Sequence, residues 1–248
     1  MTGPHLPEAA RLAARAMPDT LPVAEVFGPT LQGEGPHAGR VAVFVRLMGC
    51  NLSCSWCDTP YTWDATRHDL RAGTTHLTAV EIAARMVGRP GMLVLTGGEP
   101  LLHQHRPAML DLLTAMHGQR RPVHVETNGT IAPTEQLQRA VATFVVSPKL
   151  TNAGRHRGHQ DPRPHPAWAS TPNAVFKFVC HDERDVADAV DHATSLGITR
   201  DRIWVMPEGT TPDQLAHRWP VVAAAAAQHG VNATHRLHVL AWGDERGH

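Results

Sequence analysis

The sequence has no excess of charge, no long hydrophobic run and few cysteines. Lysine plus arginine and aspartate plus glutamate both number 23, so the formal net charge is zero, and no cationic field attracts a nucleic acid or an anionic membrane surface. The longest wholly apolar run, residues 221–227, is far shorter than the about 20 residues of a membrane-spanning helix. We therefore expect neither a nucleic-acid partner nor a membrane partner.

The four cysteines are too few for a disulfide-stabilised scaffold. Three of them lie within eight residues, a spacing that suits a metal centre better than disulfides and predicts a reducing, cytoplasmic location. The first twenty residues contain no apolar stretch like the core of a secretory signal. We expect residues 1–22 to form an N-terminal extension, either a mobile tail or a short helix.

The remaining residues, 23–248, are expected to form one α/β domain. From residue 41 onward, short β-branched runs alternate with helical stretches, which predicts parallel strands joined by right-handed crossovers. A complete or incomplete (βα) barrel and an open doubly wound sheet both fit, and both place chemistry at the carboxyl ends of the strands. The expected strands are residues 41–47, 92–95, 123–125, 144–146, 174–179, 203–205 and 237–241.

Local capping signals predict three of the helices. Thr78 and Glu81 form a capping box, and Gly88 suits a left-handed position at the end of the same helix. Two more helices are expected, one from Asp182 toward Gly197 and one from Thr211 to about Gly230, kinked or split at Pro220. Residues 151–172 have four prolines and no periodicity, so we expect a long excursion on the active-site face or a partly disordered segment, with solvated histidines.

The loop after the first of these strands carries a C-x3-C-x2-C arrangement of Cys50, Cys54 and Cys57. A structural zinc site needs four ligands, and no fourth cysteine lies nearby. A cubane iron–sulfur cluster held by three cysteines leaves one iron open to an external molecule such as S-adenosylmethionine. The alternative is a zinc knuckle completed by Cys180 or a histidine, although Cys180 is more simply a buried core thiol.

Polar segments follow the later strands at the same edge of the sheet. They are Thr-Gly-Gly-Glu-Pro at 96–100, Glu-Thr-Asn-Gly at 126–129, Ser-Pro-Lys at 147–149 and Met-Pro-Glu-Gly at 206–209. Lys149 and Lys177 are the only lysines among 23 basic residues, and strand alternation lets Lys177 face either side. An inward Arg46 needs an anionic or hydrogen-bonding partner.

The cysteine loop and the Thr-Gly-Gly-Glu-Pro turn resemble the radical S-adenosylmethionine superfamily, and the chain is similar to its 7-carboxy-7-deazaguanine synthase family. The second resemblance spans residue 23 to the C-terminus and is carried by residues 30–35, 44–46, 57–59, 126–129, 147–149 and 236–243. It implies a compact, modified partial (βα) barrel that acts as a homodimer. The implied reaction is the radical ring contraction of 6-carboxy-5,6,7,8-tetrahydropterin with loss of ammonia, in queuosine or 7-deazapurine biosynthesis.

The resemblance also implies the cofactors: a 4Fe-4S cluster, S-adenosylmethionine, Mg²⁺ and an electron supply from flavodoxin or ferredoxin. The implied metal ligands are Cys50, Cys54 and Cys57 for the cluster and Thr59 for Mg²⁺. The implied substrate contacts are Leu31, Gln32, Gly33, Arg46 and Thr96. The implied cofactor contacts are Trp56, Cys57, Asp58, Gly98, Ser147, Pro148, Lys149, Met206, Pro207, Glu208 and Gly209.

Glu126 and Lys149 are the candidate catalytic residues, and the Glu126 carboxylate suits the guanidine-like edge of a pterin, whose N–H groups it can accept. In this family the last residue can reach the substrate, whereas this chain ends in the tail 244–248. A glycyl-radical activating enzyme shares the cysteine spacing but explains neither residues 31–33 nor the Cys-Asp-Thr run at 57–59. A non-catalytic metal or electron-carrier domain is the third possibility, and it predicts a fully ligated metal.

Overall fold

The computed structural model describes residues 19–156, 161–243 and 245–247. Residues 1–18 of the expected N-terminal extension therefore lie outside the described residues. One sheet contains all nine described strands: β1 (Leu21–Leu31), β2 (Val41–Leu47), β3 (Thr75–Leu77), β4 (Met92–Gly97), β5 (Val123–Thr127), β6 (Thr143–Val146), β7 (Ala174–Cys180), β8 (Ile203–Pro207) and β9 (Asn232–Ala233).

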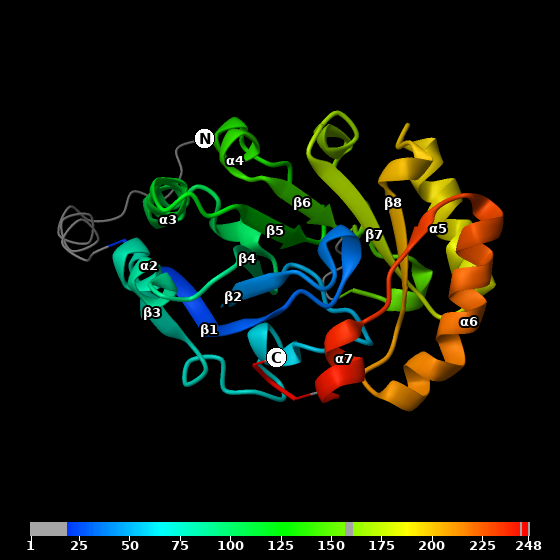
Figure 1. Cartoon of the computed structure of the whole chain (residues 1–248), viewed down its shortest axis with the longest axis horizontal. Helices are drawn as coiled ribbons and strands as arrows, with labels where there is room; N and C mark the ends of the chain where they lie inside the picture. Colours follow the sequence, from blue (N-terminus) through cyan, green and yellow to red (C-terminus); the bar gives the residue numbers. More distant parts are fainter. Residues whose placement is uncertain (1–18, 157–160, 244, 248) are drawn as a thin grey trace, which may run out of the picture.

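The strand order is β3-β1-β2-β4-β5-β6-β7-β8-β9, and the pairs from β2 through β9 are parallel. The strand β1 runs antiparallel to both of its neighbours, β2 and β3. Figure 1 shows the sheet curving, with helices α2 (Ala79–Met86), α3 (Pro107–Gly118), α4 (Glu135–Ala140), α5 (Glu183–Ser195) and α6 (Pro212–His229) around its outside. The architecture is the expected partial (βα) barrel.

Alternation along each strand separates two environments. On β2, Val43, Val45 and Leu47 join the large core that packs between the sheet and the helices. Ala42 and Phe44, which point to the other face, join Met92, Val94 and Phe27 in a smaller core inside the barrel. The next inner-facing positions toward the carboxyl ends of the strands are polar, and they therefore face the mouth of the barrel.

Six of the seven expected strands are present with nearly the expected bounds, but the prediction for residues 237–241 is wrong. These residues form helix α7 (Leu237–Trp242). A short apolar run fits a helix or a strand equally well, and β9 already occupies the sheet position beside β8. The sequence pattern predicts neither β1 nor β3, because the alternation of β-branched runs and helical stretches begins at residue 41.

The capping predictions are confirmed. Thr78 and Glu81 form the capping box of α2, Asp182 caps α5, and Gly88 has a positive φ of 75° one residue beyond the C-cap. Helix α6 ends at Gly230 in the left-handed conformation, and Pro220 lies inside it without splitting it. Among the described residues, no helix is both long enough and apolar enough to cross a membrane.

Candidate active site

One pocket lies at the carboxyl ends of the parallel strands and gathers most of the residues singled out from the sequence. Five of the parallel strands contribute inner-facing side chains to it: Arg46 from β2, Thr96 from β4, Glu126 from β5, Lys177 from β7 and Met206 from β8. The other predicted residues in its lining are Leu31, Gln32, Gly33, Cys50, Cys54, Trp56, Cys57, Asp58, Thr59, Gly98, Ser147, Lys149 and Glu208.

The three cysteines of the loop line this pocket together, and all are free thiols. Burial raises the pKa of Cys50 to about 12 and also raises that of Cys54, so thiolates here need a neighbouring cation. Within the described part of the chain, no group of three His, Cys, Asp or Glu side chains is gathered to hold a metal ion. The three sulfurs instead border open pocket space, which suits a larger group such as an iron–sulfur cluster.

Cys180 does not complete this set. It is fully buried at the end of β7, in the core between sheet and helices, and is not part of the pocket lining. The expectation of a buried core thiol is confirmed, and the zinc alternative loses its cysteine ligand. If these three thiols held a cubane cluster, its fourth iron would be open to a bound molecule.

The Gly-Gly-Glu turn after β4 packs directly on the cysteine loop. A Cβ atom on Gly98 would lie 2.0 Å from the carbonyl oxygen of Gly49, so only glycine allows this approach. The fully buried Glu99 accepts hydrogen bonds from the amide of Asn128 at 2.6 Å and from the hydroxyl of Thr127 at 2.8 Å. This carboxylate therefore ties the end of β4 to the end of β5.

The segment that follows β6 supports the cysteine loop from the other side. Asn152 accepts a 3.4 Å hydrogen bond from Trp56 Nε1 and donates to the carbonyl of Val179 at 2.9 Å and to Asp185 Oδ2 at 2.7 Å. The amide of Ser55 also donates to the carbonyl of Ala153 at 2.9 Å. The start of the 151–172 segment thus lies on the active-site face, as expected.

Lys149 stands beside Trp56 at the pocket wall. Its Nζ lies 5.3 Å from the centroid of the Trp56 ring and donates to Ser147 Oγ at 3.0 Å. An ammonium group over an aromatic face is electrostatically favourable. Lys149 therefore places a positive charge at the side of the pocket that the cysteines line.

The hydrogen bond that anchors the Arg46 guanidinium uses its Nε. Its Nε donates to Glu25 Oε1 at 2.7 Å, and Tyr61 donates to the same oxygen at 2.8 Å. Burial opposes ionisation of Glu25, but Arg46 and Tyr61 hold the pKa of this carboxyl below its usual value. No hydrogen bond between described residues uses the two Nη groups of Arg46, which lines the pocket.

The C-terminal tail passes close to this group. The Arg246 guanidinium carbon lies 4.1 Å from the centroid of the Tyr61 ring, and Arg246 Nη2 lies 3.4 Å from Glu25 Oε2. The tail therefore lies next to the two residues that anchor Arg46. The last residue, 248, lies outside the described residues.

Glu126 is held by two donors inside the barrel. Gln32 Nε2 donates to one carboxylate oxygen at 3.0 Å and Thr96 Oγ1 to the other at 2.7 Å. Each oxygen can accept a further hydrogen bond. A pocket-facing carboxylate with both oxygens oriented suits a ligand that presents two parallel N–H donors.

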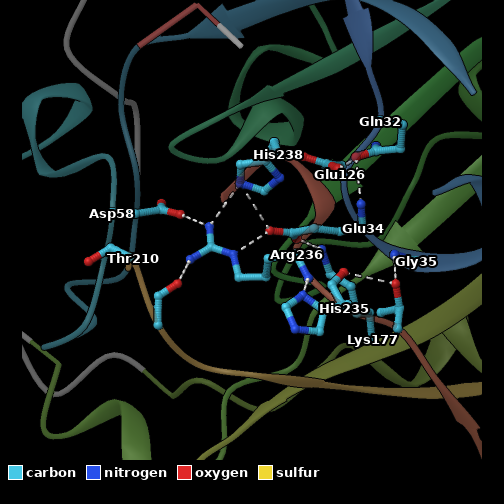
Figure 2. A network of polar contacts seen from close by, with 12 residues as sticks. Gln32, Glu34, Gly35, Asp58, Glu126, Lys177, Thr210, His235, Arg236 and His238 are labelled. Carbon is cyan, nitrogen blue, oxygen red and sulfur yellow. Dashed lines mark hydrogen bonds and ion pairs between the residues drawn. The ribbon is translucent and has the colours of Figure 1, made fainter. Parts of the chain in front are cut away.

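Glu34 is the centre of a buried charge cluster that the sequence analysis did not place in the site. It pairs with Lys177 and, at 2.8 Å, with Arg236 Nε, while Arg236 Nη2 donates to Asp58 Oδ2 at 2.5 Å (Figure 2). Burial opposes ionisation, yet Lys177 and Arg236 hold the pKa of Glu34 far below its usual value. Lys177 thus faces inward, one of the two orientations that alternation allowed.

Comparison with known proteins identifies the family. A model of the Radical SAM superfamily matches residues 45–216. The 7-carboxy-7-deazaguanine synthase of Pyrobaculum aerophilum is 40% identical over 225 residues, which cover 91% of this chain and 96% of that protein. This chain belongs to the 7-carboxy-7-deazaguanine synthase family. The family's protein from Hyperthermus butylicus is 36% identical over 243 residues, covering 93% and 97%.

Solved structures agree with the fold of this synthase family. The crystal structure of QueE from Escherichia coli matches with a TM-score of 0.63 at 23% identity, covering 94% of this chain and 100% of that chain. Streptococcus suis SuiB bound to S-adenosylmethionine matches with a TM-score of 0.52 at 16% identity, covering 76% and 48%. At these identities, the likeness shows the radical SAM fold alone.

As a radical SAM enzyme of the 7-carboxy-7-deazaguanine synthase family, the chain takes a 4Fe-4S cluster and S-adenosylmethionine as cofactors and acts on a small molecule. The expected cofactor contacts Pro148, Pro207 and Gly209 do not belong to the pocket lining, and their roles stay predictions. Sequence reasoning missed Glu34, Arg236 and His238 as lining residues. All three stand in segments that carried the resemblance to the synthase family, which was the available signal.

Proposed function

We propose that this chain converts 6-carboxy-5,6,7,8-tetrahydropterin to 7-carboxy-7-deazaguanine, with ring contraction and loss of ammonia, by the residue roles that follow. One observation carries the proposal. The same pocket holds three cysteine thiols on one side and, on the inner strand faces, an arginine fork and an oriented carboxylate. A radical-generating centre and a recognition site for an anionic, N–H-rich heterocycle would thus share one space.

Cys50, Cys54 and Cys57 would hold the 4Fe-4S cluster. When bound and supplied with one electron by an external reductant, the cluster and S-adenosylmethionine would supply a radical able to take a hydrogen atom from the pterin. Trp56, Asp58, Gly98 and the segments 147–149 and 206–209 would hold the cofactor. Lys149 supports this role, because its ammonium faces the pocket and can pair with the cofactor's carboxylate.

Arg46 would bind the substrate carboxylate. Glu25 fixes the guanidinium through Nε and leaves the two Nη groups free of hydrogen bonds to other described residues, and such a fork matches a carboxylate with two parallel hydrogen bonds. The Glu25 carboxylate also balances the charge of the buried Arg46 guanidinium when no ligand is bound. The substrate carboxylate would therefore lie beside β2.

Glu126 would anchor the opposite edge of the pterin. Gln32 and Thr96 donate to its two oxygens and so fix the plane of the carboxylate. The remaining acceptor capacity suits the guanidine-like N–H groups of the ring. Gln32 has neighbours in Leu31 and Gly33, and together they would form the substrate loop over the ring.

Thr59 would supply a hydroxyl ligand for Mg²⁺ next to the substrate carboxylate. It lines the pocket, and its Oγ1 lies 3.7 Å from Cys57 Sγ. Magnesium prefers hard oxygen ligands and commonly keeps several waters. A cation held by this hydroxyl would attract the substrate carboxylate and so help to position the substrate.

We further propose that residues 23–248 act as one domain and that the enzyme is a cytoplasmic homodimer reduced by flavodoxin or ferredoxin. The free thiols of the described residues support a reducing compartment.

The test is anaerobic incubation of the reconstituted protein with dithionite, S-adenosylmethionine, Mg²⁺ and the carboxytetrahydropterin. We expect 7-carboxy-7-deazaguanine by mass spectrometry, with 5′-deoxyadenosine beside it. Formation of 5′-deoxyadenosine without the deazaguanine would overturn the substrate assignment while leaving the radical SAM chemistry. A glycyl-radical activating enzyme would instead place a radical on a glycine of a partner protein.

A further inference from the structure

Arg236 joins three segments that are far apart in the sequence. Its Nε donates to Glu34 Oε1 at 2.8 Å, its Nη1 to the carbonyl of Gly209 at 2.5 Å, and its Nη2 to Asp58 Oδ2 at 2.5 Å. Figure 2 shows its guanidinium between Asp58 and Glu34, with His238 beside it. Arg236 therefore contacts the residue that follows the substrate loop, the cysteine loop and the segment after β8 at once.

The guanidinium is occupied by protein partners rather than open to a ligand. Its side chain is only 9% exposed, and each of its three nitrogens donates to a protein oxygen. Nη2 also lies 3.5 Å from His238 Nε2. This differs from Arg46, whose Nη groups make no hydrogen bond to another described residue. The two pocket arginines thus have different tasks.

The balance of charges stabilises the cluster of ion pairs around Arg236. Glu34 and Asp58 are the anions and Lys177 and Arg236 the cations, so the cluster is neutral as a whole. Removing one member of a buried ion cluster leaves the others without compensation, which is strongly unfavourable. A lysine at residue 236 would keep the charge, but a single ammonium cannot reproduce the three-way fork of a guanidinium.

The segments that Arg236 joins belong to different halves of the proposed site. Asp58 and Gly209 stand in the segments proposed to hold the cofactor, and Glu34 follows directly on the substrate loop. The main chain adds to this link, because the amide of Leu237 donates to the carbonyl of Gly33 at 2.9 Å and the amide of Gly35 donates to Thr234 Oγ1 at 3.1 Å. Loss of the Arg236 guanidinium would therefore let the cofactor-binding segments move relative to the substrate loop.

We propose that Arg236 is a positioning residue that fixes the cofactor-binding loops relative to the substrate loop. It touches neither reacting molecule and acts through Asp58, Gly209 and Glu34. Hydrogen transfer between two bound molecules depends steeply on their relative placement. Loss of the Arg236 guanidinium would therefore uncouple the two reactions, so that the cofactor is cleaved without formation of product. The inference rests on the proposed function, because it presumes that cofactor and pterin occupy these two sides.

The test compares Arg236→Lys with the wild type as reconstituted, anaerobic holoenzyme. The readout is the ratio of 5′-deoxyadenosine to 7-carboxy-7-deazaguanine, together with the affinity for S-adenosylhomocysteine by calorimetry and the thermal midpoint. We expect the ratio to rise by about fivefold or more, which corresponds to roughly 1 kcal/mol. The affinity for S-adenosylhomocysteine should fall by about threefold or more, because Asp58 and Gly209 lose the guanidinium that hydrogen-bonds to both.

The matched control is Arg202→Lys. Arg202 also donates to three oxygens, the carbonyls of Ala174, Ala169 and Thr171, but it lies outside the pocket lining. The Arg202→Lys variant should have a lower thermal midpoint but the wild-type ratio of 5′-deoxyadenosine to 7-carboxy-7-deazaguanine and the wild-type affinity for S-adenosylhomocysteine. A wild-type ratio and affinity in Arg236→Lys would overturn the inference. Absence of the deazaguanine product in the wild type itself would instead refute the proposed function.

Discussion

The imidazole of His238 packs against Gly33 so closely that a Cβ atom at residue 33 would lie 1.9 Å from His238 Nδ1. Gly33→Ala must therefore displace either the substrate loop or the imidazole. Overpacking of this kind costs about 1–3 kcal/mol. We expect the KM for the pterin to rise about tenfold, as measured by initial rates.

Gly118→Ala is the control for this change, since a Cβ on Gly118 would have no neighbour within 4 Å. It should leave the KM unchanged. A Gly33→Ala enzyme with the wild-type KM would show that the contact with His238 does not shape the substrate site.

The second prediction concerns the pH dependence of the Glu34 ion cluster. Glu34→Gln leaves Lys177 and Arg236 opposite a neutral amide, which should cost about 3–5 kcal/mol at pH 7. Because the pKa of Glu34 is lowered on folding, its contribution is full above the roughly 4.3 of an unfolded glutamate and is lost as the pH falls further. The difference between wild type and variant should therefore shrink below about pH 4.

Anaerobic denaturant unfolding at pH 7 and at about pH 3.5 measures this difference. Glu135→Gln is the control, since its pair with Arg139 is largely exposed and should contribute at most about 0.5 kcal/mol. A pH-independent difference for Glu34→Gln would contradict the ionised state assigned to this carboxyl.

The third prediction concerns Thr59 and magnesium. Thr59→Ala removes the only hydroxyl assigned to the cation, so stimulation of the rate by Mg²⁺ should largely disappear while 5′-deoxyadenosine still forms. Thr114→Ala, at an exposed hydroxyl on α3, should keep the wild-type response. Rates titrated with MgCl₂ measure both, and an unchanged magnesium dependence in Thr59→Ala would refute the assignment.

The fourth prediction concerns Asn152, which holds the indole of Trp56 and is itself tied to the end of β7 and to α5. Asn152→Ala should weaken S-adenosylmethionine binding about fivefold, the effect of losing roughly 1 kcal/mol of hydrogen bonding. Asn173→Ala is the control, since it removes two hydrogen bonds outside the pocket, to the carbonyls of Gln138 and Val141. Equal binding by the two variants in calorimetry would show that Asn152 has only a structural role.

The parts of the fold that could be predicted depend on local signals. The capping box of Thr78 and Glu81 and the β-branched runs of the parallel strands are readable because each is complete within a few residues. The strand β1 has mixed burial and carries no such signal. Residues 237–241 were predicted as a strand because a short apolar run does not reveal its period, and packing against the substrate loop decides it.

Only the part of the site that is made of short sequence motifs could be predicted from the sequence. The cysteine spacing and the polar strand ends place the pocket, since parallel strands bring their carboxyl ends together. The pairing of Glu34 with Arg236 joins residues 202 positions apart, and no local pattern records such a contact. Likewise, the support of Trp56 by Asn152 depends on where the segment after β6 folds back.

The central claim is that Cys50, Cys54 and Cys57 hold an iron–sulfur cluster whose fourth iron binds the cofactor. Electron paramagnetic resonance of the dithionite-reduced protein, before and after addition of S-adenosylmethionine, tests it most directly in both the wild type and Cys180→Ala. The account predicts the same cluster signal in both, with about four irons per chain and a clear change of the signal on adding the cofactor. A signal that does not respond to S-adenosylmethionine, or a cluster lost in Cys180→Ala, would contradict it.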